Sequence, residues 1–475
     1  MTKNAGINVI KKWRRMGPAQ FAVDVFGIPS EWNEDTKTGV TWQQWEASRA
    51  IVKKRRVSIR SGHGTGKSGF LAWTVLWFMS CYFPCKVPCT APTAHQLDDV
   101  LFAEISKWYG KMKELAPALA AQFDCSGSSI KMKSNPNESF CVGRTARPER
   151  PEALQGFHSE NIMFIIDEAS GVAENVFTVA EGALSTDGSF VIMTANPTLD
   201  SGYFYDSHHK MRGSWACLHW NGEESPLVSK RYVDDMATKY GVDSTIYQVR
   251  VAGNFATAID GVIPLHLCIA AQNRDVDPVP TAPIVWGVDV ARFGDDSSCL
   301  AKRQGNIMLE PTQEWYGLDT MQLVGIICNE YREARRKPSA INVDVIGIGA
   351  GVVDRLAELG YPVRGINVAE SPSVSNKYMR LRDEIWFACL EWLEALDCKM
   401  VDDEDLIAEL TTVRYKYESS GKIKVESKQE MKKRGVKSPN RADAWNLTFA
   451  NVPLMSVDEH DEFEDQDNRN EWSGY

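Results

Sequence analysis

The chain has 475 residues, 43% of them hydrophobic and 24% charged, which excludes a largely disordered protein and leaves room for two or three domains. Its formal net charge is −10. The last stretch, Ser456–Tyr475, holds eight acidic residues and one arginine, so it carries seven of these charges and leaves about −3 for the rest. We expect a solvated acidic tail there, with docking on a partner as the alternative.

Eleven cysteines are scattered without the spacing of a disulfide framework, and no apolar segment follows the basic residues near the N-terminus. This pattern predicts a reducing cytosolic environment. Cys81, Cys85 and Cys89 form one cluster, but no fourth ligand with finger-like spacing accompanies them, which favours buried free thiols over a metal site. The apolar stretch 70–83 is shorter than the roughly 20 residues of a membrane span and predicts a buried helix.

The first half of the chain alternates short apolar runs with helical patterns. A strand over 53–60 leads into a glycine-rich loop and a helix, and further strands are expected at 86–90, 161–166 and 189–193, with a helix over 96–112. Such alternation predicts a mostly parallel sheet covered on both faces. From 200 to 255 the pattern becomes aromatic and irregular, with a helix over 232–240.

The segment 256–283 is rich in proline and polar residues, and Pro278, Pro280 and Pro283 mark it as a boundary, so we expect a linker there. A second pattern follows, with strands expected at 284–290, 299–303, 307–314 and 341–345 and helices at 321–335 and 350–359. We therefore expect a P-loop domain over 1–255 with a lid subdomain at about 200–255, a mixed α/β domain over 284–453 and a tail over 454–475.

The loop between the first strand and helix has the residues of a phosphate-binding loop. Backbone N–H groups of such a loop close around a phosphate, and the helix N-terminus adds a positive dipole end. We expect Lys67 to neutralise the β and γ phosphates of ATP and Ser68 to bind Mg²⁺. Ser61 stands where the usual pattern has its first glycine. The predicted nucleotide-binding residues are Gly62, His63, Gly64, Thr65, Gly66, Lys67 and Ser68.

The apolar run 162–166 ends in two acids, Asp167 and Glu168. A buried strand with this ending is the second half of a nucleotide-hydrolysing site, in which Asp167 holds the Mg²⁺ shell and Glu168 deprotonates the attacking water. A solvated turn is the alternative for two adjacent carboxylates. The five apolar residues before them favour the buried strand.

Three weaker features surround these motifs. Gln43, between two tryptophans, is a candidate for the adenine edge, with a core position for Trp42 and Trp45 as the alternative. Thr194 and Asn196 follow a strand and are candidates to sense the γ-phosphate, with a plain turn as the alternative. The candidates for an arginine finger share one polar stretch, with solvated surface positions as the alternative, and are Arg144, Arg147 and Arg150.

Three aspartates in the second half are far apart in sequence. Asp289 and Asp344 end predicted strands, and Asp443 lies in the first turns of a predicted helix. Any one of them alone is readily a turn or cap residue. Together they suit a site for two divalent ions, Mg²⁺ or Mn²⁺, that cuts a phosphodiester. The basic run 422–441 leads into this site and predicts contact with a phosphate backbone.

From Trp42 to Trp445, the order of motifs resembles the large subunit of tailed-phage terminases. In the motor half, 42–43, 61–68, 90–93, 165–168 and 194–196 resemble its adenine, Walker A, following-strand, Walker B and coupling motifs. In the other half, Asp289, Asp344 and 438–444 resemble its ribonuclease H-like acidic motifs, with Asp295 as a less certain metal ligand by analogy. Asn440 stands where an aspartate is common.

This resemblance implies an ATPase that moves double-stranded DNA through the portal of an empty capsid and a nuclease that cuts concatemers. It further implies a small terminase subunit as partner, a homo-oligomeric ring on the portal protein, and a place in the host cytoplasm rather than in the mature virion or a membrane. Two alternatives differ in class: a helicase, which needs a second RecA-like domain, and an assembly protein without turnover. The intact Lys67, Asp167 and Glu168 argue against the second.

Overall fold

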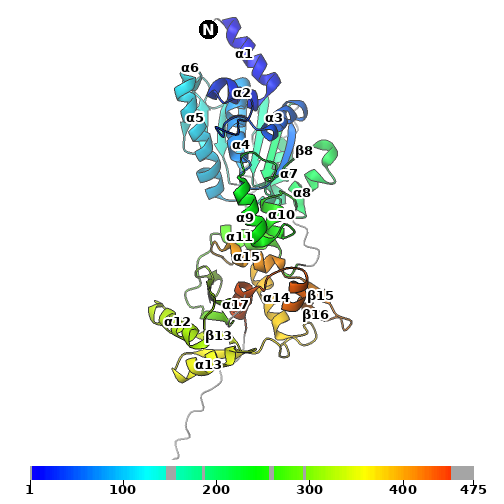
Figure 1. The fold of residues 1–475 in the computed structure, drawn as a ribbon. Helices are drawn as coiled ribbons and strands as arrows, with labels where there is room; N and C mark the ends of the chain where they lie inside the picture. Colours follow the sequence, from blue (N-terminus) through cyan, green and yellow to red (C-terminus); the bar gives the residue numbers. More distant parts are fainter. Residues whose placement is uncertain (1–2, 146–156, 184–187, 256–260, 292–295, 451–475) are drawn as a thin grey trace, which may run out of the picture. The chain divides into compact units, whose positions relative to one another are not determined.

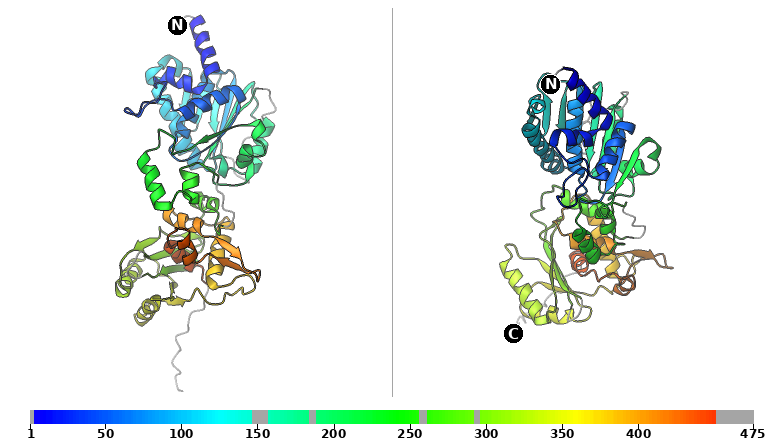
Figure 2. Two further views of the ribbon diagram at one scale, coloured as in Figure 1. Left: turned by 45° about the vertical axis from the view of Figure 1, so that its right-hand side comes forward. Right: turned by 45° about the horizontal axis from the view of Figure 1, so that its top comes forward.

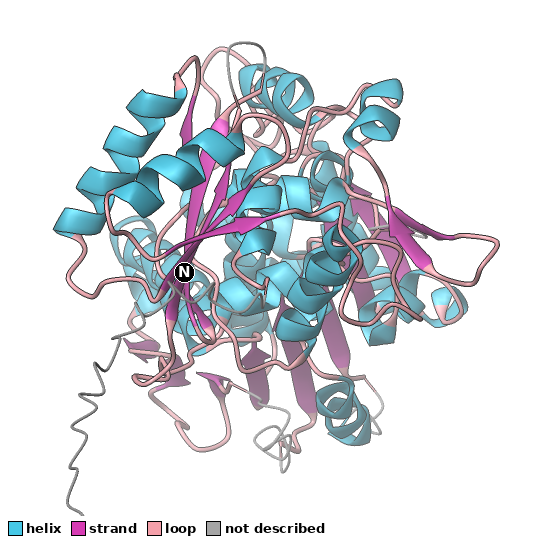
Figure 3. Cartoon of the chain, turned by 90° about the horizontal axis from the view of Figure 1, so that it is seen from below, coloured by secondary structure: helices cyan, strands magenta, loops and turns pink. Residues whose placement is uncertain are grey.

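The structure is a computed structural model that describes residues 3–145, 157–183, 188–255, 261–291 and 296–450. The chain divides into two compact units. Unit 1 comprises 1–277, 390–417 and 425–439, and unit 2 comprises 278–389, 418–424 and 440–475. Figure 3 distinguishes the helices from the strands of both units.

Unit 1 is built on an eight-stranded sheet. In sheet order the strands are β3 (Phe123–Ser126), β4 (Ser129–Met132), β5 (Phe140–Gly143), β2 (Cys85–Thr90), β6 (Asn161–Asp167), β7 (Phe190–Ala195), β1 (Arg56–Ser61) and β8 (Ala216–Trp220). The strands from β5 to β8 in this order run parallel to one another, and β3, β4 and β5 pair in antiparallel fashion. The expected mostly parallel sheet is therefore present.

Each face of this sheet has its own core. Strand β6 shows why, since Met163 and Ile165 join one core while Phe164 and Ile166 join the other, as the two-residue period of a strand requires. Helices α4 (Lys67–Cys81) and α5 (Ala103–Leu115) lie on one face, and α7 (Glu174–Ala183) and α8 (Gly202–His208) supply the core of the other (Figures 1 and 2).

Helix α4 is the predicted buried helix, and apolar side chains surround it on nearly every side. All eleven cysteines are free, and Cys81, Cys85 and Cys89 are buried, so the predicted burial of these three thiols is confirmed. None of the helices in the described part of the chain is long and apolar enough to span a membrane.

The other helices of unit 1 are α1 (Lys3–Met16), α2 (Pro18–Phe26), α3 (Trp42–Lys54), the π-helical η1 (Gln96–Phe102), α6 (Pro117–Ala120), η3 (Ala169–Gly171), η4 (Arg212–Ser214), α9 (Lys230–Tyr240), α10 (Thr245–Arg250), α11 (Leu265–Asn273), α15 (Glu404–Thr412) and α16 (Lys428–Lys433). The segment 390–417 belongs to this unit through specific contacts. Glu404 pairs with Arg250, and Asp405 pairs with Lys239.

Unit 2 is built on a six-stranded mixed sheet. Its strands are β11 (Ile307–Met308), β10 (Ser298–Gln304), β9 (Ile284–Asp289), β13 (Ala340–Asp344) and β14 (Val363–Ile366), with β12 (Gln313–Trp315) paired to β10. Its helices are α12 (Thr320–Glu333), α13 (Gly349–Glu358) and α17 (Asn440–Leu447). Strand β15 (Tyr415–Tyr417) belongs to unit 1, whereas α14 (Leu381–Glu394) and β16 (Ile423–Val425) contain residues assigned to both units.

One expected strand is corrected by the structure. Residues 307–314 do not form one strand but two short pieces, β11 and β12, which pair with different parts of β10. Pro311 lies between them, and a proline lacks the N–H that a continuous ladder needs.

The approach of α17 to β9 depends on a glycine. A Cβ at Gly287 would lie 2.0 Å from the carbonyl oxygen of Ala444, so α17 rests on the bare backbone of the strand. This contact brings Asp443, one residue before Ala444, to the strand that ends at Asp289.

We predict that Gly287→Ala destabilises unit 2 by about 1–3 kcal/mol, because the added methyl group forces the helix from the strand. Hydrogen exchange of β9 and α17, read by mass spectrometry, should rise. Gly351→Ala is the matched control, since nothing lies within 4 Å of its Cβ position on α13. Unchanged protection in Gly287→Ala would contradict the close contact.

Candidate functional site

The phosphate-binding loop lies where β1 ends and α4 begins, and α4 starts at Lys67. Gly64 and Gly66 have positive φ values of 71° and 85°, which favour glycine. Gly62 is needed for space, since a Cβ there would lie 2.2 Å from the Val251 carbonyl oxygen. Ser61 is the last residue of β1, so this position needs no glycine conformation.

Lys67 lies at the centre of the loop's polar contacts. Its Nζ donates to Asn196 Oδ1 at 3.0 Å and to Glu168 Oε1 at 3.3 Å. Asn196 in turn donates from Nδ2 to the Ser61 carbonyl at 2.7 Å, which joins the end of β7 to the end of β1. The predicted Walker A, Walker B and coupling residues therefore meet at the carboxyl ends of neighbouring parallel strands, where α/β folds bind ligands.

The two acids at the end of β6 have different environments. Asp167 is buried, and its Oδ1 accepts hydrogen bonds from Thr194 Oγ1 at 2.6 Å and from the Glu168 N–H at 3.0 Å. Burial, and then the charge of Glu168, raise the pKa of Asp167 to about 6. Glu168 has a φ of 47°, an uncommon conformation for a residue other than glycine, and it turns the chain at the strand end.

These environments fit the ligand that the motif implies. A buried carboxylate with a raised pKa gains from a divalent cation, which is the role expected of Asp167. The loop adds no acid of its own, and His63 lies beside the cations Lys67 and Arg250, which lower its pKa.

Gln43 lies in the first turn of α3, next to the capping box of Thr41 and Gln44. Its Nε2 donates to the Asn221 carbonyl at 3.1 Å, while its buried Oε1 has no partner within the described residues. An unpaired buried acceptor costs free energy until a donor reaches it, and the exocyclic amine of adenine is such a donor. Trp42 is 49% exposed, so it is not a core residue.

The arginine candidates are placed only in part. Arg144 follows β5 and is exposed, and its backbone N–H donates to the Cys89 carbonyl oxygen at 2.9 Å. Arg147 and Arg150 lie outside the described residues. Sequence reasoning missed Arg250, whose carbonyl accepts the His63 N–H at 2.6 Å and whose buried side chain pairs with Glu404. No local pattern marks it, because both partners come from distant segments.

The second group of acids gathers around β9 and β13. These strands are parallel neighbours, with Val343 opposite Val288, so Asp344 and Asp289 end adjacent strands in register. Gly349, the first residue of α13, lies against the backbone of Asp344, since a Cβ there would be 1.8 Å from the Asp344 carbonyl oxygen. Asp443 reaches the same region on α17 through the Gly287 contact.

Two of the candidate acids in unit 2, Asp344 and Asp443, accept hydrogen bonds from groups of the same chain. Arg382 donates to Asp443 Oδ1 at 3.2 Å, and Asp344 Oδ1 accepts the Ile346 N–H at 2.9 Å. Within the described residues, no three His, Cys, Asp or Glu side chains are close enough together to hold a metal ion. Asp295, the fourth candidate, lies outside those residues. The buried Asn440 donates to Ser297 Oγ at 3.2 Å.

The basic run 422–441 is partly neutralised by acids. Arg434 pairs with Glu426 at 2.7 Å, Arg441 with Glu314 at 2.8 Å, and Lys424 with Glu418 at 3.3 Å. These three cations are paired with acidic residues of the chain, and contact of the run with a phosphate backbone stays a prediction.

The fold and sites thus define a chain with a P-loop unit followed by a mixed-sheet unit that carries acids on adjacent strand ends. No protein-family model matches the chain. A curated relative, "Probable terminase, large subunit" of Enterobacteria phage P7, is 28% identical over 436 residues, which cover 85% of this chain and 87% of the relative. The predicted resemblance to terminase large subunits is confirmed.

Two solved structures are also similar. The large terminase of a thermophilic bacteriophage, in complex with ADP, covers 87% of this chain and 97% of its own, at 14% identity and a TM-score of 0.40. The nuclease domain of the large terminase subunit of bacterial virus Sf6 covers 41% of this chain and 100% of its own, at 19% identity and a TM-score of 0.36.

We predict that Gln43→Leu weakens ATP binding about fivefold to tenfold, because the base loses its hydrogen-bonding partner. Binding of GTP, which lacks the adenine amine, should change less. Titration of fluorescent nucleotides measures both affinities, with Gln20→Leu on α2 as the matched control. An equal loss for ATP and GTP would assign Gln43 a structural role instead.

Proposed function

We propose that this chain is the large subunit of a phage terminase, in which ATP hydrolysis drives double-stranded DNA into a procapsid and a metal-dependent nuclease cuts the concatemer. The observation that carries the proposal is the contact of Lys67 with both Glu168 and Asn196, in a chain whose second sheet carries Asp289 and Asp344 side by side. The relative from phage P7 supports the same assignment.

In the motor site, the loop 62–66 would enclose the phosphates with its N–H groups, and Lys67 would leave Glu168 for the β and γ phosphates of ATP. Ser68 and Asp167 would hold Mg²⁺, whose charge offsets that of the phosphates. Glu168, freed from Lys67, would orient the attacking water and accept its proton.

Coupling of hydrolysis to motion would run through β7. Thr194 contacts Asp167, and Asn196 contacts both Lys67 and the backbone of Ser61. A change at the γ-phosphate that moves Lys67 or the metal therefore displaces the end of β7. The arginine finger stays a prediction, with Arg144, Arg147 and Arg150 as candidates.

In the nuclease site, Asp289, Asp344 and Asp443 would hold two divalent cations, Mg²⁺ or Mn²⁺, with Asp295 as an additional ligand. Such ions activate a water and stabilise the leaving oxygen of the phosphodiester. Arg382 pairs with Asp443 at 3.2 Å, so this carboxylate would have to leave the guanidinium to bind a cation.

The role of terminase implies DNA and the packaging machinery as partners. More specifically, we propose that the chain works in the host cytoplasm with a small terminase subunit, as a homo-oligomeric ring on the portal protein. The domain limits proposed from sequence are 1–255 and 284–453, joined by the linker 256–283. The helicase alternative lacks support, because β10 in unit 2 pairs with β9 and β12 in antiparallel fashion, unlike the parallel sheet of a RecA-like domain.

We predict that two variants separate the activities of the full chain. Lys67→Ala should lower ATP hydrolysis by about 100-fold or more, since the phosphates lose their cation, and should leave Mn²⁺-dependent plasmid nicking intact. Asp289→Asn should instead abolish Mn²⁺-dependent plasmid nicking, because the proposed site loses a metal ligand, and should leave ATP hydrolysis intact. Phosphate release and gel assays of plasmid nicking measure the two activities.

Folding of each variant is checked by circular dichroism. Loss of both activities in a folded Lys67→Ala protein would contradict two separate sites. Undiminished nicking by Asp289→Asn would remove the nuclease assignment.

A further inference from the structure

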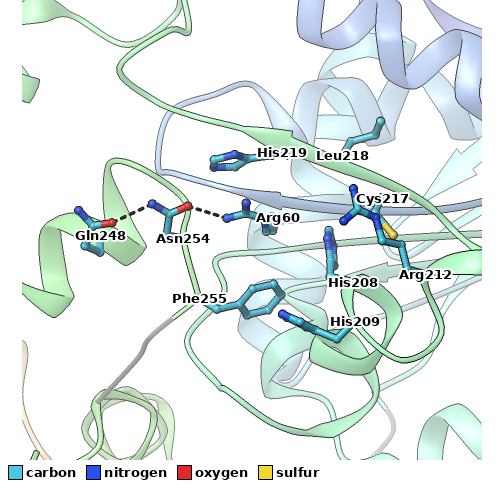
Figure 4. Close-up of a pocket in the computed structure, with 10 residues that line it drawn as sticks. All are labelled: Arg60, His208, His209, Arg212, Cys217, Leu218, His219, Gln248, Asn254 and Phe255. Atoms are coloured by element: carbon cyan, nitrogen blue, oxygen red, sulfur yellow. Dashed lines mark hydrogen bonds between the residues drawn. The ribbon is translucent and has the colours of Figure 1, made fainter. Parts of the chain in front are cut away.

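Unit 1 contains a cavity of about 500 Å³ that is separate from the phosphate-binding loop. It lies between the ends of β1 and β8, the end of α8 and the segment after α10 (Figure 4). Its lining residues are Arg60, His208, His209, Arg212, Cys217, Leu218, His219, Gln248, Asn254 and Phe255. Among these described residues there are two arginines and three histidines, and none is acidic.

Arg60 is held in place by neutral groups. Its Nη1 donates to the Gly253 carbonyl at 2.6 Å and to Asn254 Oδ1 at 2.8 Å, and Asn254 donates to Gln248 Oε1 at 2.8 Å. Figure 4 shows this chain of side chains along one wall. The guanidinium also lies over the Phe255 ring, 5.6 Å from its centre. Arg60 is thus oriented, but these partners carry no formal charge to balance its own.

A second cation faces the same space. Arg212 lines the cavity together with Arg60, and burial, followed by the charge of Arg212, lowers the pKa of Arg60. Arg212 is exposed in η4, and the described residues offer its side chain no hydrogen bond or ion pair. Two arginines that line one cavity without an acidic residue among the described lining suit an anion.

Two of the lining histidines, His208 and His219, add hydrogen-bonding groups whose pKa is lowered. Burial, and then Arg60, lower the pKa of His208 to about 3, and its Nε2 lies 3.0 Å from Ser58 Oγ. His219 Nε2 lies 2.6 Å from the Ala252 carbonyl oxygen, and burial lowers its pKa too. Arg60 and Arg212 therefore bring formal positive charge to the cavity, and the Phe255 ring lies beside Arg60.

We propose that this cavity is a second phosphate-binding site, which takes a polyphosphate or phosphate-ester group between Arg60 and Arg212. The planar guanidinium suits phosphate oxygens, and the volume falls in the range of about 300–1,000 Å³ that small ligands occupy. The site is distinct from the P-loop, since its lining includes neither Lys67 nor Ser68. Its wall nevertheless touches that loop, because a Cβ at Gly253 would lie 2.7 Å from the Gly62 nitrogen.

Pyrophosphate binding to the full chain, measured by isothermal titration calorimetry, tests the proposal. We expect two sites in the unaltered protein, and one in Lys67→Ala if that change disables the P-loop. Adding Arg212→Gln to Lys67→Ala should then weaken the remaining site about tenfold or abolish it. Arg231→Gln on exposed α9 is the matched control and should leave both sites intact.

Arg212 is exposed, so its loss is not expected to unfold the protein, and Arg60→Gln provides a second variant on the same site. Equal pyrophosphate affinity in Lys67→Ala with and without Arg212→Gln would overturn the proposal, as would the absence of any site besides the P-loop. Competition by a short DNA duplex in Lys67→Ala distinguishes the source of the phosphate. Displacement of pyrophosphate supports a backbone phosphate, and retention supports a free polyphosphate.

Discussion

The buried ammonium of Lys67 is the constraint on which the motor site depends. Its side chain is only 10% exposed, and a buried cation is costly unless charged or polar groups surround it. Glu168 and Asn196 provide those groups, and they come from the ends of β6 and β7. This ion pair thus holds the cation and the proposed base together at the loop where phosphate would bind.

This arrangement is possible because the sheet is parallel. Parallel strands bring their carboxyl ends to one edge, so residues 61, 167 and 194 become neighbours although more than a hundred residues separate the first from the last. In unit 2, too, parallel strands bring functional candidates to one edge of the sheet. There Asp289 and Asp344 end adjacent parallel strands, and Gly287 lets α17 bring a third carboxylate from the far end of the chain.

The sequence predicted the parts of the fold in which local pattern and tertiary structure agree. The strands β6, β7 and β9 consist mostly of apolar residues, and α4 is apolar on nearly every side, so burial determines both pattern and structure. The hairpins of β3, β4 and β5 and the edge strand β8 were missed, because half-exposed short strands mix polar and apolar residues.

The candidate site shows the same limit. The loop and the acids after β6 could be predicted, since each is a contiguous motif, and Ser61 is explained by its place in a strand. Arg250, Arg382 and the cavity around Arg60 could not, because their partners are brought together only by the fold. Gln43 is an intermediate case. The sequence made it a candidate for adenine binding, but only the structure shows that its buried Oε1 has no partner among the described residues.

The most direct test of the account is single-turnover hydrolysis by Glu168→Gln, which removes the proposed base and keeps the shape of the side chain. The account predicts that ATP binds with nearly unchanged affinity while the hydrolysis step slows by about 100-fold or more. Hydrolysis at the unaltered rate, in a folded variant that binds ATP, would show that the carboxylate facing Lys67 is not the base and would contradict the motor site as described.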